Sequence, residues 1–145
     1  MSSLQAANWS KAAYPFDCGA PQNGQTFGYF VQQVSYLYLS GTASALVLVR
    51  CNAGAGSPPV GLYLFQPGPL GRPELAGTLL AITYPVDISN DFQAHGFTFQ
   101  VSALGGATVT MTAGAYSSAT VPNCCPDASR TFNWTWNGTG FTRSG

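Results

Sequence analysis

Two apolar segments near the middle of the chain dominate its hydrophobic pattern. Residues 45–51 (ALVLVRC) are apolar on both faces of an extended strand until Arg50, because successive side chains point to opposite sides. Residues 60–65 (VGLYLF) repeat this pattern. The NAGAGSPP segment between them contains glycines that permit positive φ and two prolines that stop a helix. We therefore expect a β-hairpin with a long irregular connection, whose first strand is covered on both faces.

Three later segments alternate between apolar and polar residues, which is the pattern of a strand with one face in water. Their apolar sides consist of Phe97, Phe99 and Val101, of Val109, Met111 and Ala113, and of Phe132, Trp134 and Trp136. Their polar sides consist of Thr98, Gln100 and Ser102, of Thr108, Thr110 and Thr112, and of Thr131, Asn133, Thr135 and Asn137. Asn137-Gly138 is a strong hairpin-turn dipeptide that predicts a return of the chain through Phe141.

The remaining segments give weaker patterns. Tyr29–Leu39 predicts a strand, and Glu74–Thr83 predicts another, although LAGTLLAI within it also fits a helix. Residues 84–96 form the longest polar stretch and predict a loop. Ser3–Lys11 predicts a short N-terminal helix, capped by Ser2 or Ser3 and ended by Tyr14-Pro15.

Seven or eight strands joined mostly by short turns predict a mainly β fold. The expected arrangement is an antiparallel meander that closes as a barrel or folds as a sandwich. The chain has 145 residues, and neither a linker nor a break in composition divides it. We therefore expect a single β domain over residues 1–145.

The chain has few charged residues, and this composition limits the classes of partner that we expect. Charged residues make up 7% of the sequence and the formal net charge is zero. We expect no nucleic-acid partner, because phosphate neutralisation requires Lys and Arg. The same scarcity leaves little electrostatic protection against association, which favours a protein partner or a homo-oligomer. We expect no transmembrane segment, because no stretch reaches the ~20 apolar residues of a membrane span.

Four cysteines, at positions 18, 51, 124 and 125, predict two structural disulfides. Adjacent cysteines rarely bond to each other, so we expect Cys18 to pair with one of Cys124 and Cys125, and Cys51 with the other. Each bond would close a long loop and contribute about 3–4 kcal/mol. MSSLQAANWSKAAYP lacks the apolar core of a signal peptide, so the protein is either cytoplasmic or an exported mature chain. The cysteines favour the exported, extracytoplasmic alternative.

Candidate catalytic and metal-binding groups are few. His95 is the sole histidine, and Asp87 and Asp91 are the only close pair of carboxylates. A hydrolase that uses these three residues is one hypothesis, but an exposed loop histidine and ordinary Asp turn chemistry explain them as well. NAGAGSPP leads into a strand, with no lysine nearby, and therefore lacks the helix start that a phosphate-binding loop needs. The cysteines lack paired CxxC spacings, so we expect no zinc. Because so few charged residues are available for acid–base chemistry, we also expect no catalytic residue, and no motif indicates a cofactor.

Aromatic and hydroxyl side chains provide the other binding candidates. Trp134 and Trp136 share one strand side and would stack on a sugar if exposed, or belong to the core if buried. The row of Thr108, Thr110 and Thr112 is a regular hydroxyl face. Binding of ice or a glycan would require that row to be repeated on neighbouring strands, whereas a single row is an ordinary solvated face.

Three segments together carry a family resemblance. YPFDCG (14–19), ALVLVRCNAGAGSPPVGLYLF (45–65) and PNCCPDASRTFNWTWNGTGF (122–141) resemble the LppP/LprE family of actinobacterial envelope lipoproteins. The resemblance implies an exported, envelope-associated protein, normally anchored through a lipidated cysteine, and it implies no catalytic activity or ligand. Members of that family often carry an acidic, calcium-binding type of turn before the central strand. Here this turn is LSGTASA (39–45), which has no carboxylate, so we expect no calcium there.

The leading hypothesis from the sequence is a non-enzymatic, exported envelope or surface domain with a structural, adhesion or partner-binding role. One alternative is a module that binds a small ligand or glycan through Trp134, Trp136 or the 84–96 segment. The other alternative is a hydrolase that uses His95 with Asp87 or Asp91.

Overall fold

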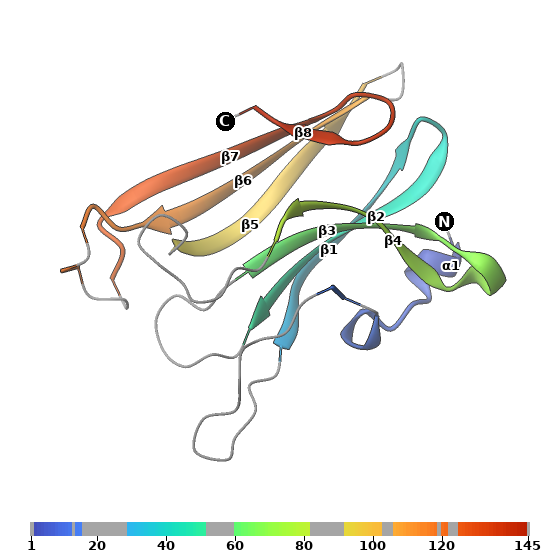
Figure 1. Ribbon diagram of the computed structural model, residues 1–145, viewed down its shortest axis with the longest axis horizontal. Coiled ribbons are helices and arrows are strands. Elements are labelled where there is room, and N and C mark those ends of the chain that lie inside the picture. The colour runs from blue at the N-terminus through green and yellow to red at the C-terminus, as the bar shows by residue number, and fades with distance from the viewer. Residues whose placement is uncertain are drawn as a thin grey trace, which may run out of the picture.

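A computed structural model describes residues 2–12, 14–15, 29–51, 60–81, 92–102, 106–118, 120–121 and 125–144. The described residues contain eight strands, two short helical segments that precede them, and a third helical segment between β3 and β4 (Figure 1). The helical segments are α1 (Ser2–Gln5), η1 (Trp9–Lys11) and η2 (Pro69–Gly71). The strands are β1 (Tyr29–Leu39), β2 (Thr42–Cys51), β3 (Val60–Pro67), β4 (Pro73–Leu80), β5 (Phe92–Val101), β6 (Ala107–Ala115), β7 (Ala128–Trp136) and β8 (Phe141–Arg143).

The strands form two antiparallel sheets of four, in the orders β1-β2-β3-β4 and β5-β6-β7-β8. Strands that follow each other in the chain are neighbours in each sheet, which confirms the expected mainly β meander. Figure 1 shows the two sheets as two layers. Of the two expected closures, a closed barrel is absent from the described residues, which instead form two separate sheets around a shared core.

The core lies between the two sheets because each contributes the apolar side of its strands. Leu46, Leu48 and Leu62 from the first sheet meet Met111 and Trp134 from the second, and all five are at most 1% exposed. The predicted alternation of β6 is confirmed, since its apolar positions are buried while Thr108 and Thr112 are exposed. Burial of large apolar side chains of this kind stabilises a fold by about 1.5–3 kcal/mol each.

Strand β2 is buried on both faces, as its sequence predicted. Its residues 44–49 are all fully buried. Leu46 and Leu48 face the second sheet, whereas Val47 and Val49 belong to a second apolar cluster on the outer face. The N-terminal segment covers that outer face (Figure 1). The Trp9 ring lies 5.3 Å from the ring of Phe65, and the Trp9 indole N–H donates to the Tyr36 hydroxyl at 2.9 Å.

The predicted N-terminal helix over Ser3–Lys11 is only partly correct. The chain forms one turn at α1, leaves the helical conformation, and makes a second turn at η1. Asn8 separates the two turns, because its backbone is extended and its side-chain oxygen accepts a hydrogen bond from the Ser10 amide at 3.2 Å. A short polar side chain of this kind competes with helix continuation by bonding to the nearby backbone. The interruption places Leu4 and Trp9 on the sheet, where both are buried.

A pair of adjacent glutamines joins the two sheets along one edge. Gln33 lies at an irregularity in β1, and its side-chain amide donates to the Phe97 carbonyl at 2.8 Å and accepts from the Phe97 amide at 2.9 Å. Gln32 donates to the Ala94 carbonyl at 2.9 Å. The Gln33 side chain therefore takes the place that a neighbouring strand would occupy beside β5. Gly96 permits this approach, because its φ is +126° and a Cβ there would lie 2.9 Å from Gln33 Oε1.

The directions of the strands gather several turns at one end of the molecule. Strands β1 and β3 run toward this end, and β5 runs in the same direction as β1, because Gln32 meets Ala94 while Gln33 meets Phe97. We call it the turn end. It contains the β1–β2 turn at Ser40–Gly41, the β3–β4 turn at 68–72, and the β7–β8 turn at 137–140. At the opposite end, β2 ends at Cys51, and Cys125 lies shortly before β7 begins.

Two of the predicted elements are corrected by the structure. The segment predicted over Glu74–Thr83 is the strand β4, so the helical alternative for LAGTLLAI is wrong through Leu80. The predicted loop over 84–96 is wrong at its end, because Phe92 to Gly96 already belong to β5. Pairing with β6, a hydrogen bond from Gln32 of β1, and burial of Phe92 and Ala94 in the core fix this segment as a strand. Residues 82–91 lie outside the described residues.

Candidate binding face

The outer faces of the two sheets differ in their covering. The N-terminal segment packs over β2 and β3 on the first sheet. On the second sheet, the outward positions of β5, β6 and β7 include exposed Thr98, Thr108, Thr112, Thr131 and Thr135. No described element packs on these positions as the N-terminal segment packs on the first sheet. The second sheet therefore presents a polar face, which we call the open face.

Strand register arranges the open face as rows that cross several strands. Thr98 of β5 pairs with Thr110 of β6, which pairs with Asn133 of β7. A second row runs through Gln100, Thr108, Thr135 and Thr142. A third runs through Gly96, Thr112 and Thr131. Side chains directly opposite each other lie about 4.5–5.5 Å apart, so these rows bring hydroxyl and amide groups within reach of one ligand.

The threonine row of β6 is thus repeated on neighbouring strands. The sequence showed Thr108, Thr110 and Thr112 as one regular row, and repetition was the condition for a binding surface. Strand β7 supplies Thr131 and Thr135 in register with that row. One bond already crosses the face, where the Thr110 hydroxyl donates to Asn133 Oδ1 at 2.9 Å. The structure therefore meets the condition that the sequence alone left open.

Charged side chains are absent from the outward positions of this sheet within the described residues. The arginines of β7 and β8 lie on the core side, where the guanidinium carbons of Arg130 and Arg143 are 4.5 and 4.7 Å from the centroid of the buried Phe132 ring. Burial, and then the charge of Arg143, lower the pKa of Arg130 below its usual range. The open face thus offers neutral donors and acceptors, which suit a neutral ligand rich in hydroxyl groups.

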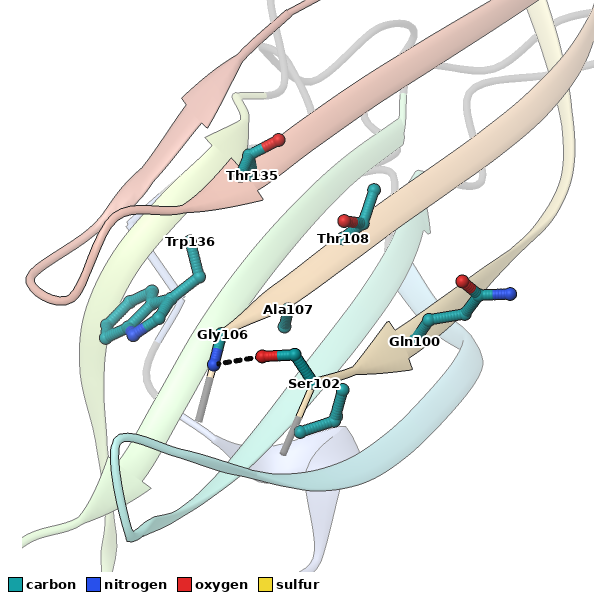
Figure 2. Close-up of a pocket in the computed structure, with 8 residues that line it drawn as sticks. Gln100, Ser102, Gly106, Ala107, Thr108, Thr135 and Trp136 are labelled. Carbon is teal, nitrogen blue, oxygen red and sulfur yellow. Dashed lines mark hydrogen bonds between the residues drawn. The ribbon is translucent and has the colours of Figure 1, made fainter. Parts of the chain in front are cut away.

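A depression of about 310 Å³ lies where the open face reaches the turn end (Figure 2). Gln100, Thr108 and Thr135 supply polar groups, while Trp136 supplies an aromatic ring. Figure 2 shows Trp136 and Gln100 on opposite sides of this group. The Gly106 amide donates to the Ser102 hydroxyl at 3.0 Å and holds the two ends of the β5–β6 connection together.

A second depression of about 220 Å³ lies farther along the same face. Thr98, Thr110 and Thr112 line it together with Gln33, which enters from the edge of the first sheet. His95 stands beside it as an exposed residue at the irregularity of β5. Thr108 lines the first depression and Thr110 the second, so the two depressions occupy successive outward positions of β6.

The two predicted tryptophans have different environments. Trp134 is 1% exposed, its ring is stacked on Phe132 at 5.9 Å, and its indole N–H donates to the Leu79 carbonyl at 3.1 Å. Trp134 is therefore a core residue and leaves no ring face for a ligand, which corrects its candidacy as a ligand-binding residue. Trp136 is half-buried, donates to the Ser40 hydroxyl at 3.0 Å and lines the first depression. Trp136 thus remains a binding candidate.

The structure describes two of the four cysteines that are predicted to form disulfides. Neither Cys51 nor Cys125 is a free thiol. Cys18 and Cys124 lie outside the described residues. Which cysteines pair therefore stays a prediction, although Cys51 and Cys125 lie at the same end of the molecule, as the proposed pairing requires.

The hydrolase candidates are only partly visible. His95 is exposed on strand β5, whereas Asp87 and Asp91 lie outside the described residues, as does the NAGAGSPP segment. The described part of the chain contains no group of three or more His, Cys, Asp or Glu side chains that could hold a metal ion. Within the same residues, no helix is long and apolar enough to cross a membrane.

Sequence reasoning missed several residues of the depressions. Gln33 gives no signal in the sequence, because it lies in a strand of mixed polarity and meets Phe97 across 64 positions. For Gln100 and Ser102, the sequence pattern predicts only that they lie on the polar, solvent-facing side of a strand. No family model matches the chain, and no curated protein or solved structure matches it either. The resemblance to the LppP/LprE family therefore stays a prediction.

Proposed function

We propose that this chain is a non-enzymatic, exported binding module of the bacterial envelope, which adheres to its partner through the open face of the β5–β8 sheet. The observation that carries this proposal is the asymmetry of the two sheets. The first sheet is covered by residues of the chain itself, including Leu4 and Trp9. The second presents rows of uncharged hydroxyl and amide groups to solvent.

The composition supports a binding role over a catalytic one. General acid–base chemistry needs titratable groups with matched geometry, and the two depressions of the open face are lined by hydroxyl and amide groups and a single imidazole among their titratable and polar side chains. His95 is the one titratable side chain at either depression. Hydroxyl and amide groups bind and orient a ligand, but they supply no general acid or base near neutral pH.

The proposal includes export of the protein and disulfide bonds between its cysteines. Cys51 and Cys125 lie at one end of the molecule and neither is a free thiol, which supports disulfides that include Cys18 and Cys124. Disulfides persist in oxidising compartments, so this chemistry supports an extracytoplasmic location. Both connectivities remain open, with Cys51 paired to either member of the 124–125 pair. The resemblance to actinobacterial envelope lipoproteins supports the same location.

Adsorption to actinobacterial cell-envelope fragments tests the proposal. The variant T108E/T135E places two negative charges on the open face, and T78E places one on the outer face of the first sheet, where Thr78 is exposed beside Tyr63. Wild type and T78E should sediment with the fragments, whereas T108E/T135E should remain in solution. Equal adsorption of T108E/T135E and T78E, or no adsorption of wild type, would contradict the proposal.

A further inference from the structure

We infer that the open face binds one neutral polysaccharide chain that lies along β6 and occupies both depressions. This inference rests on the proposed function and names the chemical class of its ligand. It follows from three features: the alignment of the two depressions, the absence of charged side chains at the outward positions, and the half-buried Trp136 at the edge of the first depression.

The alignment of the depressions favours an extended ligand. Thr108 belongs to the first depression, and Thr110 and Thr112 belong to the second. These three outward positions of one strand span about 13 Å, because a strand rises about 3.3 Å per residue. A monosaccharide would occupy one depression only. A short run of linked sugars would contact both and would gain hydrogen bonds from two further strands.

The chemistry of the lining groups favours a neutral carbohydrate over an ionic ligand. Threonine hydroxyls and the Gln100 amide donate and accept hydrogen bonds, as sugar hydroxyls do. Phosphate or carboxylate groups would need arginine or lysine partners, and neither depression contains one. At the turn end, Trp136 borders the first depression from the core side of β7, where its ring packs against Phe141 at a centroid distance of 5.2 Å, and it gives that depression an apolar edge that a sugar can contact.

Ice is a second ligand that a regular array of threonines could bind, and the structure disfavours it. A crystal lattice requires strict repetition in two dimensions. Here Asn133 replaces threonine at the centre of the β7 row, and Gly96 interrupts β5 with a φ of +126°. The sheet also twists, as β-sheets generally do. A flexible chain adapts to these irregularities, whereas a crystal plane does not.

Titration calorimetry with defined oligosaccharides tests this inference. The probes are cellohexaose, chitohexaose, maltohexaose and mannohexaose, with glucose as the monosaccharide and hexagalacturonic acid as the charged chain. At least one neutral hexasaccharide should bind at least tenfold more tightly than glucose. Binding by none of them, equal binding of hexagalacturonic acid, or thermal hysteresis in an ice-growth assay without glycan binding would overturn the inference.

Matched substitutions then test the two depressions separately. T135V changes the first and T112V the second, while T78V makes the same change on the opposite side of the molecule. Valine keeps the β-branched shape that strands favour, so the fold should persist, and circular dichroism checks this. T135V and T112V should each weaken hexasaccharide binding about fivefold, the effect of one lost hydrogen bond. An effect confined to one depression, or shared by T78V, would overturn the two-depression arrangement.

The two proposals fail in distinguishable ways. If envelope adsorption depends on the open face but no neutral hexasaccharide binds, the proposed function stands and the carbohydrate assignment falls. If wild type does not adsorb to the envelope fragments but binds a neutral hexasaccharide through both depressions, the carbohydrate assignment stands and the proposed location falls.

Discussion

Substitution of Gln33 by methionine should destabilise the fold because it breaks the junction between the two sheets. The Gln33 amide makes two hydrogen bonds with the Phe97 backbone, at 2.8 and 2.9 Å. Methionine keeps the length of the side chain but removes both bonds. A net contribution of about 1 kcal/mol per bond, with partly buried backbone groups left unpaired, gives a loss of about 2–3 kcal/mol. For a chain of this size the melting temperature should fall by about 7–10 °C.

Gln32 provides an adjacent control of the same residue type. It makes one hydrogen bond, to the Ala94 carbonyl, and its buried Oε1 has no hydrogen-bond partner. Q32M therefore loses one bond but also removes an unsatisfied buried acceptor, so its net cost should stay within about 1 kcal/mol. Urea unfolding followed by circular dichroism measures both variants. The reasoning is refuted if Q32M costs as much as Q33M, or if Q33M is as stable as wild type.

A double-mutant cycle with Gly96 tests the geometry of the same junction. G96A introduces a methyl group that would lie 2.9 Å from Gln33 Oε1, at a φ of +126°. With Gln33 present, the variant suffers both this clash and the backbone strain, which alone costs about 1–3 kcal/mol. In a Q33A background only the strain remains. The cycle should therefore give a non-zero coupling energy, and simple additivity would count against the close approach.

Three further predictions concern the core, the N-terminal segment and one exposed carboxylate. W134F should lower the free energy of unfolding in urea by about 2–4 kcal/mol, because it leaves a cavity and removes the hydrogen bond to the Leu79 carbonyl. W136F, at a half-buried position, should lower it by about 1 kcal/mol or less. Equal losses in the two variants would contradict the difference in burial. Burial, and then Tyr29, raise the pKa of Tyr14 far above its usual value, so its stabilising effect is complete below about pH 10 and is lost as pH rises through the folded-state pKa. Alkaline titration should therefore loosen the N-terminal segment and increase binding of an apolar dye, and Y14F should lack this pH step. Hydrogen bonds from the Ser117 side chain and amide lower the pKa of Asp127, so its stabilising effect is present above the unfolded-state pKa and is lost as pH falls through the folded-state pKa. Carboxyl NMR titration should show this pKa rising in S117A, and an unchanged value would exclude the side-chain hydrogen bond as its cause.

The strands could be predicted from the sequence because local alternation determines them. Tyr29–Leu39 was placed with the bounds it has in the structure, and the polar sides of β6 and β7 were read correctly. The start of β5 could not be placed, because the irregularity between Ala94 and Gly96 shifts the alternation of buried residues, and because the segment is held by the Gln32 contact with Ala94, which joins residues 62 positions apart. Long-range contacts of this kind leave no periodic signal in the chain.

Only part of the candidate site could be predicted from the sequence, again because long-range contacts determine the rest. The side chains of Trp134 and Trp136 point to the same side of β7, so the alternation alone cannot show which of them is partly exposed to solvent. Their difference comes from the end of the sheet, where Trp136 meets Ser40 at the turn end while Trp134 lies under Leu79. Likewise, threonine rows can be read along each strand, but only register shows that Thr108 pairs with Thr135.

The most direct test of the account is an NMR titration of protein with labelled threonine methyl groups, using the neutral hexasaccharide that binds best. The account predicts chemical-shift changes at Thr98, Thr108, Thr110, Thr112, Thr131 and Thr135 on the open face, with Thr42 and Thr78 of the first sheet unchanged. Changes centred on Thr78, or no changes on the open face at saturating ligand, would contradict it.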